Sequence, residues 1–188
     1  MSELKGLLER VTAAMTGANV PFMIAGSFAS TAHGLPRTTQ DLDIVIDPTS
    51  DALDALLRAL PPAQYYVDLD SARDALQRRT MFNVIDQATG WKIDFIIRKN
   101  RAFSREEFAR RIAMTLLDVP VFIASPEDTV VAKLEWSVQS GGSQRQRRDV
   151  AGVLATLGSR LDRAYVERWV RDLALEDEWA AAQAASTE

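Results

Sequence analysis

The chain contains no cysteine among its 188 residues, which excludes disulfide bonds and thiolate ligands for a metal. No apolar run approaches the length of a membrane-spanning helix, and the charged first residues lack the apolar segment of a signal peptide. The formal net charge of -4 argues against non-specific binding to nucleic acid. We therefore expect a cytoplasmic protein with no membrane partner.

The composition is that of a globular protein, with 47% hydrophobic and 26% charged residues. Short apolar runs typical of strands alternate with amphipathic stretches over the first two-thirds of the chain, and only helical patterns follow. This order predicts an α/β (α+β) fold. We expect a small mixed sheet with flanking helices in residues 1–124, followed by a helical C-terminal region, residues 125–188, packed on that core.

Turn and capping residues divide these patterns into elements. Strands are expected at residues 21–25, 42–46, 64–67, 81–86, 91–98 and 115–124. Helices are expected at residues 3–18, 26–34, 50–60, 71–79, 104–113, 126–138, 144–157, 162–174 and 176–185. The clearest helix start follows Ser125, which can cap the helix, because Pro126 suits the first position and two acids follow it.

Two aspartates, Asp41 and Asp43, stand at the start of the second predicted strand. Residues two apart in a strand point to the same face of the sheet. Carboxylates held side by side repel each other unless a cation lies between them, and such oxygen ligands suit Mg²⁺, which binds one or two carboxylates together with substrate phosphates. Upstream, Gly26 and Ser27 can offer backbone N–H and hydroxyl groups to those phosphates. The pattern indicates nucleotide chemistry.

A third acid, Asp94, lies among isoleucine and phenylalanine residues in a later predicted strand. A carboxylate on a buried face is costly unless a metal or a polar partner compensates it. If this strand neighbours that of Asp41 and Asp43, three carboxylates converge, and together with substrate phosphates they can hold two Mg²⁺ ions. Asp94 is then also a candidate general base for the attacking hydroxyl.

These residues together resemble the nucleotidyltransferase (polymerase-beta-like) superfamily. Its pattern is Gly-Ser, a short helix, Asp-x-Asp on a strand and a third acid on a neighbouring strand. The stretch at residues 25–43 is most similar to the minimal branch that includes the AbiEii-type toxins of type IV toxin–antitoxin systems. That branch continues with Asp-x-x-x-Arg, matched by Asp94 and Arg98. Two features depart from its pattern: a longer gap between Ser27 and Asp41, and Gly152 where members often carry an aspartate.

The resemblance implies a role for each matched position, with Mg²⁺ in a two-ion site as the cofactor and an NTP as the substrate. The implied catalytic and metal-binding residues are Asp41, Asp43 and Asp94. The implied nucleotide-binding residues are Gly26, Ser27, Lys133 on a downstream helix, and Asp149 of the later pair Arg148-Asp149.

Several other residues near these motifs have two interpretations. Arg37 is a candidate ligand of the triphosphate, because guanidinium pairs well with phosphate oxygens, or else a solvated turn residue. His33 is either a polar group at a helix end or a functional residue. Two basic clusters either steer an RNA or nucleotide or form solvated faces; they consist of Arg98, Lys99, Arg101, Arg105, Arg110 and Arg111, and of Arg145, Arg147 and Arg148. The tryptophans at 136, 169 and 179 can either stack on a base or pack in the helical core, and we expect them in the core.

The leading functional hypothesis is Mg²⁺-dependent transfer of an NMP from an NTP to a hydroxyl of RNA, tRNA or a protein. Such an enzyme is a candidate toxin neutralised by an antitoxin protein. The alternative from another class is a non-catalytic module that binds a nucleotide or a partner and keeps the same fold. A third hypothesis is an enzyme that modifies aminoglycosides, but the arginine-rich stretches weigh against a polycationic substrate.

Overall fold

The structure is a computed structural model that describes residues 2–186 of the chain. These residues form two compact units, each with its own buried core. One unit comprises residues up to 24 together with residues 39–123. The other comprises residues 25–38 together with residues from 124 onward. The fold class predicted from the sequence, a mixed sheet with flanking helices followed by a helical C-terminal part, is confirmed.

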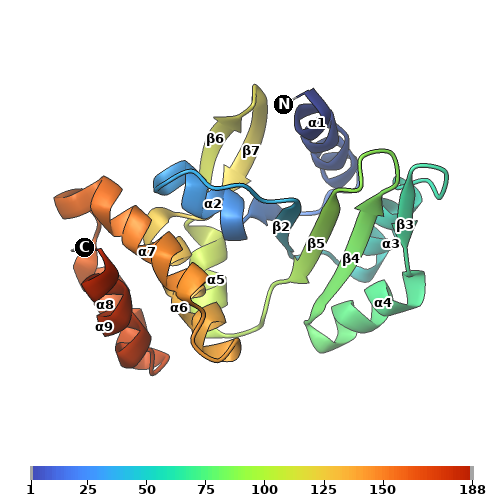
Figure 1. Ribbon diagram of the computed structural model, residues 1–188. Coiled ribbons are helices and arrows are strands. Elements are labelled where there is room, and N and C mark those ends of the chain that lie inside the picture. The colour runs from blue at the N-terminus through green and yellow to red at the C-terminus, as the bar shows by residue number, and fades with distance from the viewer. Residues whose placement is uncertain (1, 187–188) are drawn as a thin grey trace. The chain divides into compact units, whose positions relative to one another are not determined.

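The first unit is built on one mixed sheet (Figure 1). Its strands are β1 (Phe22–Ile24), β2 (Asp41–Ile46), β3 (Tyr65–Val67), β4 (Met81–Asp86), β5 (Lys92–Ile97), β6 (Ile112–Leu116) and β7 (Val119–Ile123). Its helices are α1 (Ser2–Gly17), α3 (Ser50–Arg58), α4 (Leu69–Arg78) and α5 (Ala102–Ala109). Within the described residues, the strand order is β3-β4-β5-β2-β1-β7-β6. At its centre, β2 runs parallel to β5 and antiparallel to β1.

The two faces of this sheet differ in character. Phe82 and Val84 of β4 are buried, and the Phe82 ring stacks on that of Phe95 in β5 with 5.2 Å between centroids. Helix α4 packs against β4, and α1 packs against β7. The alternate residues of β4, such as Asn83, are exposed. The apolar alternation of the strands therefore fixes which side chains reach the opposite face, where the candidate acids lie.

One predicted strand, residues 115–124, is wrong. Strands β6 and β7 form an antiparallel hairpin there, and the two residues between them, Leu117 and Asp118, have φ of 49° and 65°. Two-residue hairpin turns favour positive φ at both positions, which glycine and asparagine adopt most easily. A Leu-Asp turn gives no such signal in the sequence. The preceding helix, α5, was expected at residues 104–113 but spans Ala102–Ala109, with Arg101 as its N-cap.

The second unit is helical. Its elements are α2 (Gly26–His33), α6 (Pro126–Gln139), α7 (Gln144–Leu157), the short 3-10 turn η1 (Gly158–Arg160), α8 (Arg163–Asp172) and α9 (Glu176–Ala185). Helix α6 contacts α2, α7, α8 and α9. Its predicted start is confirmed, because the Ser125 hydroxyl accepts the Asp128 N–H at 3.2 Å. Asp128 is itself fully buried and accepts hydrogen bonds of 2.5 Å from the hydroxyls of Ser125 and Tyr165.

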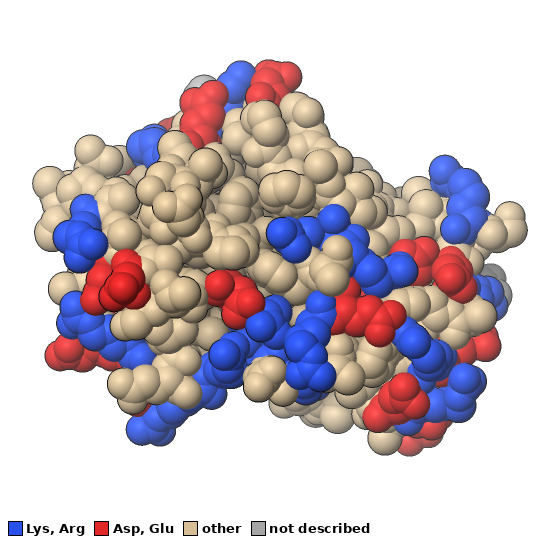
Figure 2. All heavy atoms as spheres, turned by 180° about the vertical axis from the view of Figure 1, so that it is seen from behind, with Lys and Arg blue, Asp and Glu red and all other residues tan. Residues whose placement is uncertain are grey.

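The surface carries charges of both signs. Figure 2 shows one face on which Lys and Arg side chains are interspersed with Asp and Glu side chains. This mixture agrees with the small net charge of -4. Among the described helices, none is both long enough and apolar enough to cross a bilayer.

Candidate functional site

The three candidate acids lie on neighbouring strands of the first unit. In the parallel pair β2 and β5, Asp43 stands opposite Asp94, and Asp41 stands opposite Lys92. Partners in such a register project to the same face, so all four side chains share it. Asp41 is exposed, Asp43 is half-buried, and Asp94 is buried with 6% of its surface exposed. The expectation that the strand of Asp94 neighbours that of the other two acids is confirmed.

Lys92 contacts two of these acids. Its Nζ lies 2.9 Å from Asp94 Oδ2 and 3.6 Å from Asp41 Oδ1. The hydrogen bond to Asp94 is the main cause that raises the pKa of Lys92 above its ordinary value, with the charges of both acids adding to it. Sequence reasoning missed this lysine. The sequence did contain a signal for it, because a residue two positions before Asp94 in a strand lies on the same face of the sheet.

Asp94 has a second partner in Asn83 of β4, its register neighbour on the other side. The Asn83 Nδ2 donates to Asp94 Oδ1 at 2.7 Å, whereas Lys92 donates to Oδ2. Both carboxylate oxygens are therefore hydrogen-bonded, which offsets the cost of burying this charge. The amide and the ammonium fix the orientation of the carboxylate on the sheet.

The carboxylates fit a divalent cation in their chemistry, because oxygen ligands are those that Mg²⁺ prefers. Asp41 and Asp94 already share one cation, the Lys92 ammonium. Among the described residues, however, no three acidic or histidine side chains gather closely enough to hold a metal ion. The structure thus shows a lysine between two of the acids, and a metal site formed by all three stays a prediction.

The residues predicted to bind nucleotide phosphates lie in the second unit. Gly26 begins α2 with φ of 58°, a left-handed conformation that favours glycine, and Ser27 follows it with 6% exposure. The N-cap of α2, Ala25, makes no side-chain capping bond. Backbone N–H groups at such a helix start attract anions.

Four of the predicted residues meet in one cluster, which we call the Ser27–Asp149 cluster: Ser27, Arg37, Lys133 and Asp149. The Arg37 guanidinium donates to the Ser27 hydroxyl through Nη2 and to both Asp149 oxygens through Nε, at 3.0 and 3.2 Å. The Lys133 Nζ donates to Asp149 Oδ2 at 2.7 Å. Two cations and one carboxylate leave the cluster with a formal charge of +1, which suits a phosphate group.

Two glycines allow the loop that carries Arg37 to approach α7 closely. A Cβ built on Gly34 would lie 2.8 Å from the backbone nitrogen of Val153 and 2.9 Å from the carbonyl carbon of Gly152. A Cβ on Gly152 would lie 3.2 Å from the backbone nitrogen of Leu35. Gly152 therefore lies at a point where the loop fills the space that a side chain would need.

The other candidates of this region have structural partners. The His33 Nε2 donates to the Ala124 carbonyl at 2.8 Å, which supports the interpretation of His33 as a polar group at a helix end. In the basic clusters, Arg98 pairs with Asp47 at 2.8 Å, and the Arg111 guanidinium lies 4.6 Å from the centroid of the Phe108 ring. These partners weaken the interpretation of the first cluster as a nucleic-acid surface. Of the tryptophans expected in the core, those at 169 and 179 are buried, and that at 136 is 45% exposed.

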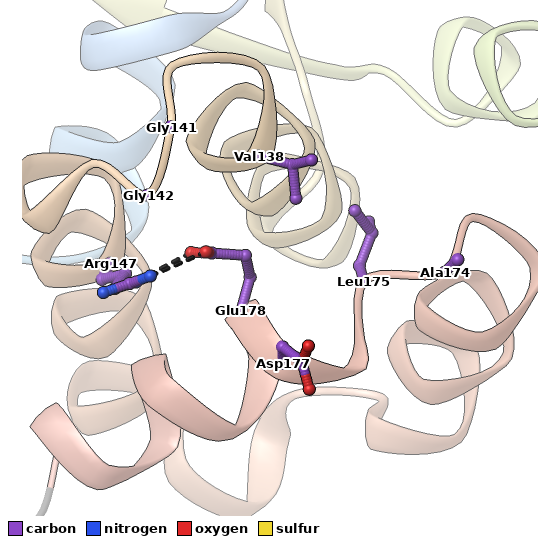
Figure 3. A pocket seen from close by; sticks show the side chains of 8 residues that line it. All are labelled: Val138, Gly141, Gly142, Arg147, Ala174, Leu175, Asp177 and Glu178. Atoms are coloured by element: carbon purple, nitrogen blue, oxygen red, sulfur yellow. Dashed lines mark hydrogen bonds and ion pairs between the residues drawn. The ribbon is translucent and has the colours of Figure 1, made fainter.

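A pocket of about 370 Å³ lies in the second unit, and its lining includes none of the predicted catalytic or nucleotide-binding residues. Figure 3 shows its lining, from the loop after α6 to the start of α9. Arg147 and Glu178 meet in this pocket in a double hydrogen bond of 2.7 and 2.8 Å. The bond to Arg147 is the main cause that lowers the pKa of Glu178, and the Ser137 hydroxyl adds to it. The pair joins α7 to α9, so one arginine of the second predicted basic cluster, Arg147, has a structural partner.

Comparison with known proteins finds no matching family model and no matching curated protein. Solved structures do match over most of the chain. The crystal structure of ANT(2″)-Ia in complex with adenylyl-2″-tobramycin is 14% identical, with a TM-score of 0.61, over 92% of this chain and 99% of that one. The solution structure of the same antibiotic-resistance factor is 16% identical, with a TM-score of 0.58, over 98% of each chain.

A third match is an antigenic nucleotidyltransferase-like protein from Paracoccidioides brasiliensis, 15% identical with a TM-score of 0.50. It covers 93% of this chain, which covers 92% of that protein. At such low identity, these likenesses show the fold alone, which the chain shares with these solved structures. The narrower resemblance to AbiEii-type toxins stays a prediction.

Proposed function

We propose that the protein is a Mg²⁺-dependent nucleotidyltransferase that moves an NMP from an NTP to a hydroxyl acceptor and releases pyrophosphate. The observation that carries this proposal is the Ser27–Asp149 cluster. It brings together residues from three distant parts of the sequence, and each was a candidate for binding the nucleotide. The register of Asp43 opposite Asp94 adds a set of acids for the reacting end of the same substrate.

The assignment of both sets to one nucleotide is part of this proposal, and the short covalent link between Arg37 and Asp41 is compatible with it. Arg37 and Asp41 are four residues apart, so their Cα atoms are at most about 14 Å apart even in a fully extended chain. A bound triphosphate and the metal on it need groups within such a reach of each other. The loop between α2 and β2 thus carries a phosphate ligand near one end and an acid at the other.

In this reaction the acceptor oxygen attacks the α-phosphorus, the bond from that phosphorus to the bridging oxygen breaks, and pyrophosphate leaves. Mg²⁺, held by Asp41, Asp43 and Asp94, would neutralise phosphate charge and lower the pKa of the acceptor hydroxyl. Ser27 and the cations of the Ser27–Asp149 cluster would orient the triphosphate. Asp94, held in orientation by Asn83, would accept the proton of the hydroxyl.

The surroundings of Asp94 bear on the acceptor. On the same face, β3 and β4 present Tyr66, Met81 and Ile85 with 63%, 37% and 39% of their surfaces exposed. Such a face suits an acceptor with an apolar or aromatic part, such as a nucleobase at an RNA end that stacks on Tyr66. We therefore keep RNA or tRNA as the first acceptor to test, with protein second. A role as a toxin with an antitoxin partner belongs to the same proposal.

An aminoglycoside is the second candidate acceptor. The fold likeness to ANT(2″)-Ia, which is solved with an adenylylated tobramycin, is the observation that favours it. A polycationic acceptor needs carboxylates around the attacking hydroxyl, whereas Lys92 neutralises part of the negative charge here. Added salt weakens the binding of either acceptor, because it screens attraction between opposite charges in both cases, so direct labelling of each acceptor must distinguish them.

The experiment follows label from each α-³²P NTP to tRNA, to total protein and to tobramycin, with Mg²⁺ present. We expect transfer to one acceptor class, and its loss by at least about a hundredfold in the double variant Asp41→Ala, Asp43→Ala. The matched control is Asp70→Ala, Asp74→Ala, which removes two exposed carboxylates from α4. Transfer that survives loss of Asp41 and Asp43 contradicts the assignment of the site.

Calorimetry separates the non-catalytic alternative from the enzyme. If an NTP binds together with Mg²⁺ but no pyrophosphate is released with any acceptor, the protein is a binding module. For the toxin proposal, expression of the wild type should arrest growth and expression of Asp94→Asn should not. Growth arrest by both proteins would indicate toxicity that does not depend on catalysis.

A further inference from the structure

We propose that Lys92 is a built-in competitor of the metal ion: its ammonium holds Asp41 and Asp94 in the nucleotide-free protein and is displaced when Mg²⁺ enters. This inference rests on the proposed function, because it concerns the same acids. It adds a residue that sets how tightly, and in which order, the metal binds.

The contacts of Asp94 carry the argument. One oxygen of this buried carboxylate accepts from Asn83 at 2.7 Å, and the other accepts from Lys92 at 2.9 Å. Mg²⁺ requires ligand oxygens at about 2.0–2.1 Å in a near-octahedral arrangement. An ammonium hydrogen-bonded to the same oxygen lies in the way of such a bond. A metal that takes this oxygen therefore competes with Lys92 for its electron pairs and is repelled by the ammonium charge.

The position of Lys92 on β5 lets its side chain contact both acids. Its register partner is Asp41, and Asp94 follows two residues later on the same face, so one flexible side chain reaches both carboxylates. Without a cation, the acids of β2 and β5 repel each other across adjacent strands. Lys92 relieves that repulsion in a protein without metal, at the cost of competing with the metal.

This competition predicts an order of binding. A free divalent ion that displaces Lys92 gains only the carboxylate oxygens as ligands, so it binds weakly on its own. An ion that arrives on a triphosphate gains the phosphate oxygens as additional ligands and displaces the lysine more readily. The nucleotide and the metal should therefore bind together.

The test measures Mn²⁺ binding without nucleotide, by electron paramagnetic resonance of the free ion. We expect Lys92→Met to bind Mn²⁺ about tenfold more tightly than the wild type, which equals about 1.4 kcal/mol. Lys92→Arg should stay close to the wild type because it keeps a cation. The matched control is Lys5→Met, which removes another lysine that pairs with an aspartate, Asp118, at 3.0 Å.

Two further readouts keep the inference testable if the variant is unstable. Without metal, Lys92→Met should unfold at a lower temperature than the wild type. Mn²⁺ should raise the Tm of the variant more than that of the wild type, because a ligand stabilises the state that it binds. In the wild-type protein, Mg²⁺ with a non-hydrolysable NTP should increase acetylation of Lys92, measured by mass spectrometry, and leave Lys5 unchanged.

Equal Mn²⁺ affinity in the wild type and Lys92→Met overturns the inference. So does an extent of Lys92 acetylation that is the same with and without Mg²⁺ and the NTP. These results are separable from failure of the proposed function. If labelled NMP is still transferred while Mn²⁺ affinity is unchanged, only the role of Lys92 fails. If no variant binds Mn²⁺ and no acceptor is labelled, the metal site itself is wrong.

Discussion

Replacing Asp149 with asparagine tests the Ser27–Asp149 cluster directly. The Asp149 carboxylate is 7% exposed and compensates Lys133, which is 6% exposed, and Arg37, which is 23% exposed. Asparagine keeps the shape but removes the negative charge that both cations contact. Removing one partner of a buried ion pair costs about 3–5 kcal/mol, and the partial exposure of Arg37 places the loss near about 3 kcal/mol.

Thermal unfolding measures this loss. For a chain of this length, each kcal/mol lowers Tm by about 2–4 °C, so Asp149→Asn should unfold about 6–12 °C below the wild type. Inorganic triphosphate should restore more of the lost stability in the variant than it adds to the wild type, because the phosphates replace the missing carboxylate. This second effect separates an anion site from an ion pair that serves structure alone.

The control for this prediction is Asp172→Asn, which neutralises an exposed aspartate at the end of α8 in the same unit. Surface changes of this kind shift stability by about 0.5 kcal/mol or less. If Asp149→Asn costs no more than Asp172→Asn, the compensation of two cations by one carboxylate is refuted. If triphosphate stabilises the wild type and the variant equally, the cluster is not the phosphate site.

Two other predictions concern the second unit. Gly34→Ala should lower the free energy of unfolding in urea by about 1–3 kcal/mol, because its Cβ would lie 2.8 Å from the backbone of Val153. The control is Gly17→Ala, whose Cβ meets no atom within 4 Å and should be neutral or stabilising. The pKa of Glu178 is lowered by Arg147, so the stability from this pair is present above the ordinary value of 4.5 and is lost as the pH falls through the lower folded value. Glu178→Gln should therefore be less stable at pH 7 and show a flatter loss of stability on acidification; equal slopes in the two proteins would contradict the assignment.

The sequence predicted the local features of this protein well where a local rule decides them. The start of α6 follows from Ser125 and the proline and acids after it, and the structure confirms the cap. The alternation of strands predicted that Asp41 and Asp43 share a face. The turn at Leu117 and Asp118 escaped prediction because neither residue is typical of positive φ.

The site could be predicted only as a list of residues. Asp41, Asp43 and Asp94 were found from their chemistry and from the family resemblance. Lys92 was missed, because its partners depend on the parallel register of β2 and β5, strands about fifty residues apart in the chain. A sequence pattern does not state which strands become neighbours.

By itself, the sequence determined the fold class, most elements and the polar face of each central strand, because hydrophobic periodicity and capping act over a few residues. Only the tertiary structure decided that Arg37 meets Asp149, 112 residues away, and that Lys92 lies between two acids. The reason is physical: such contacts depend on how whole elements pack, and no local spacing encodes that packing.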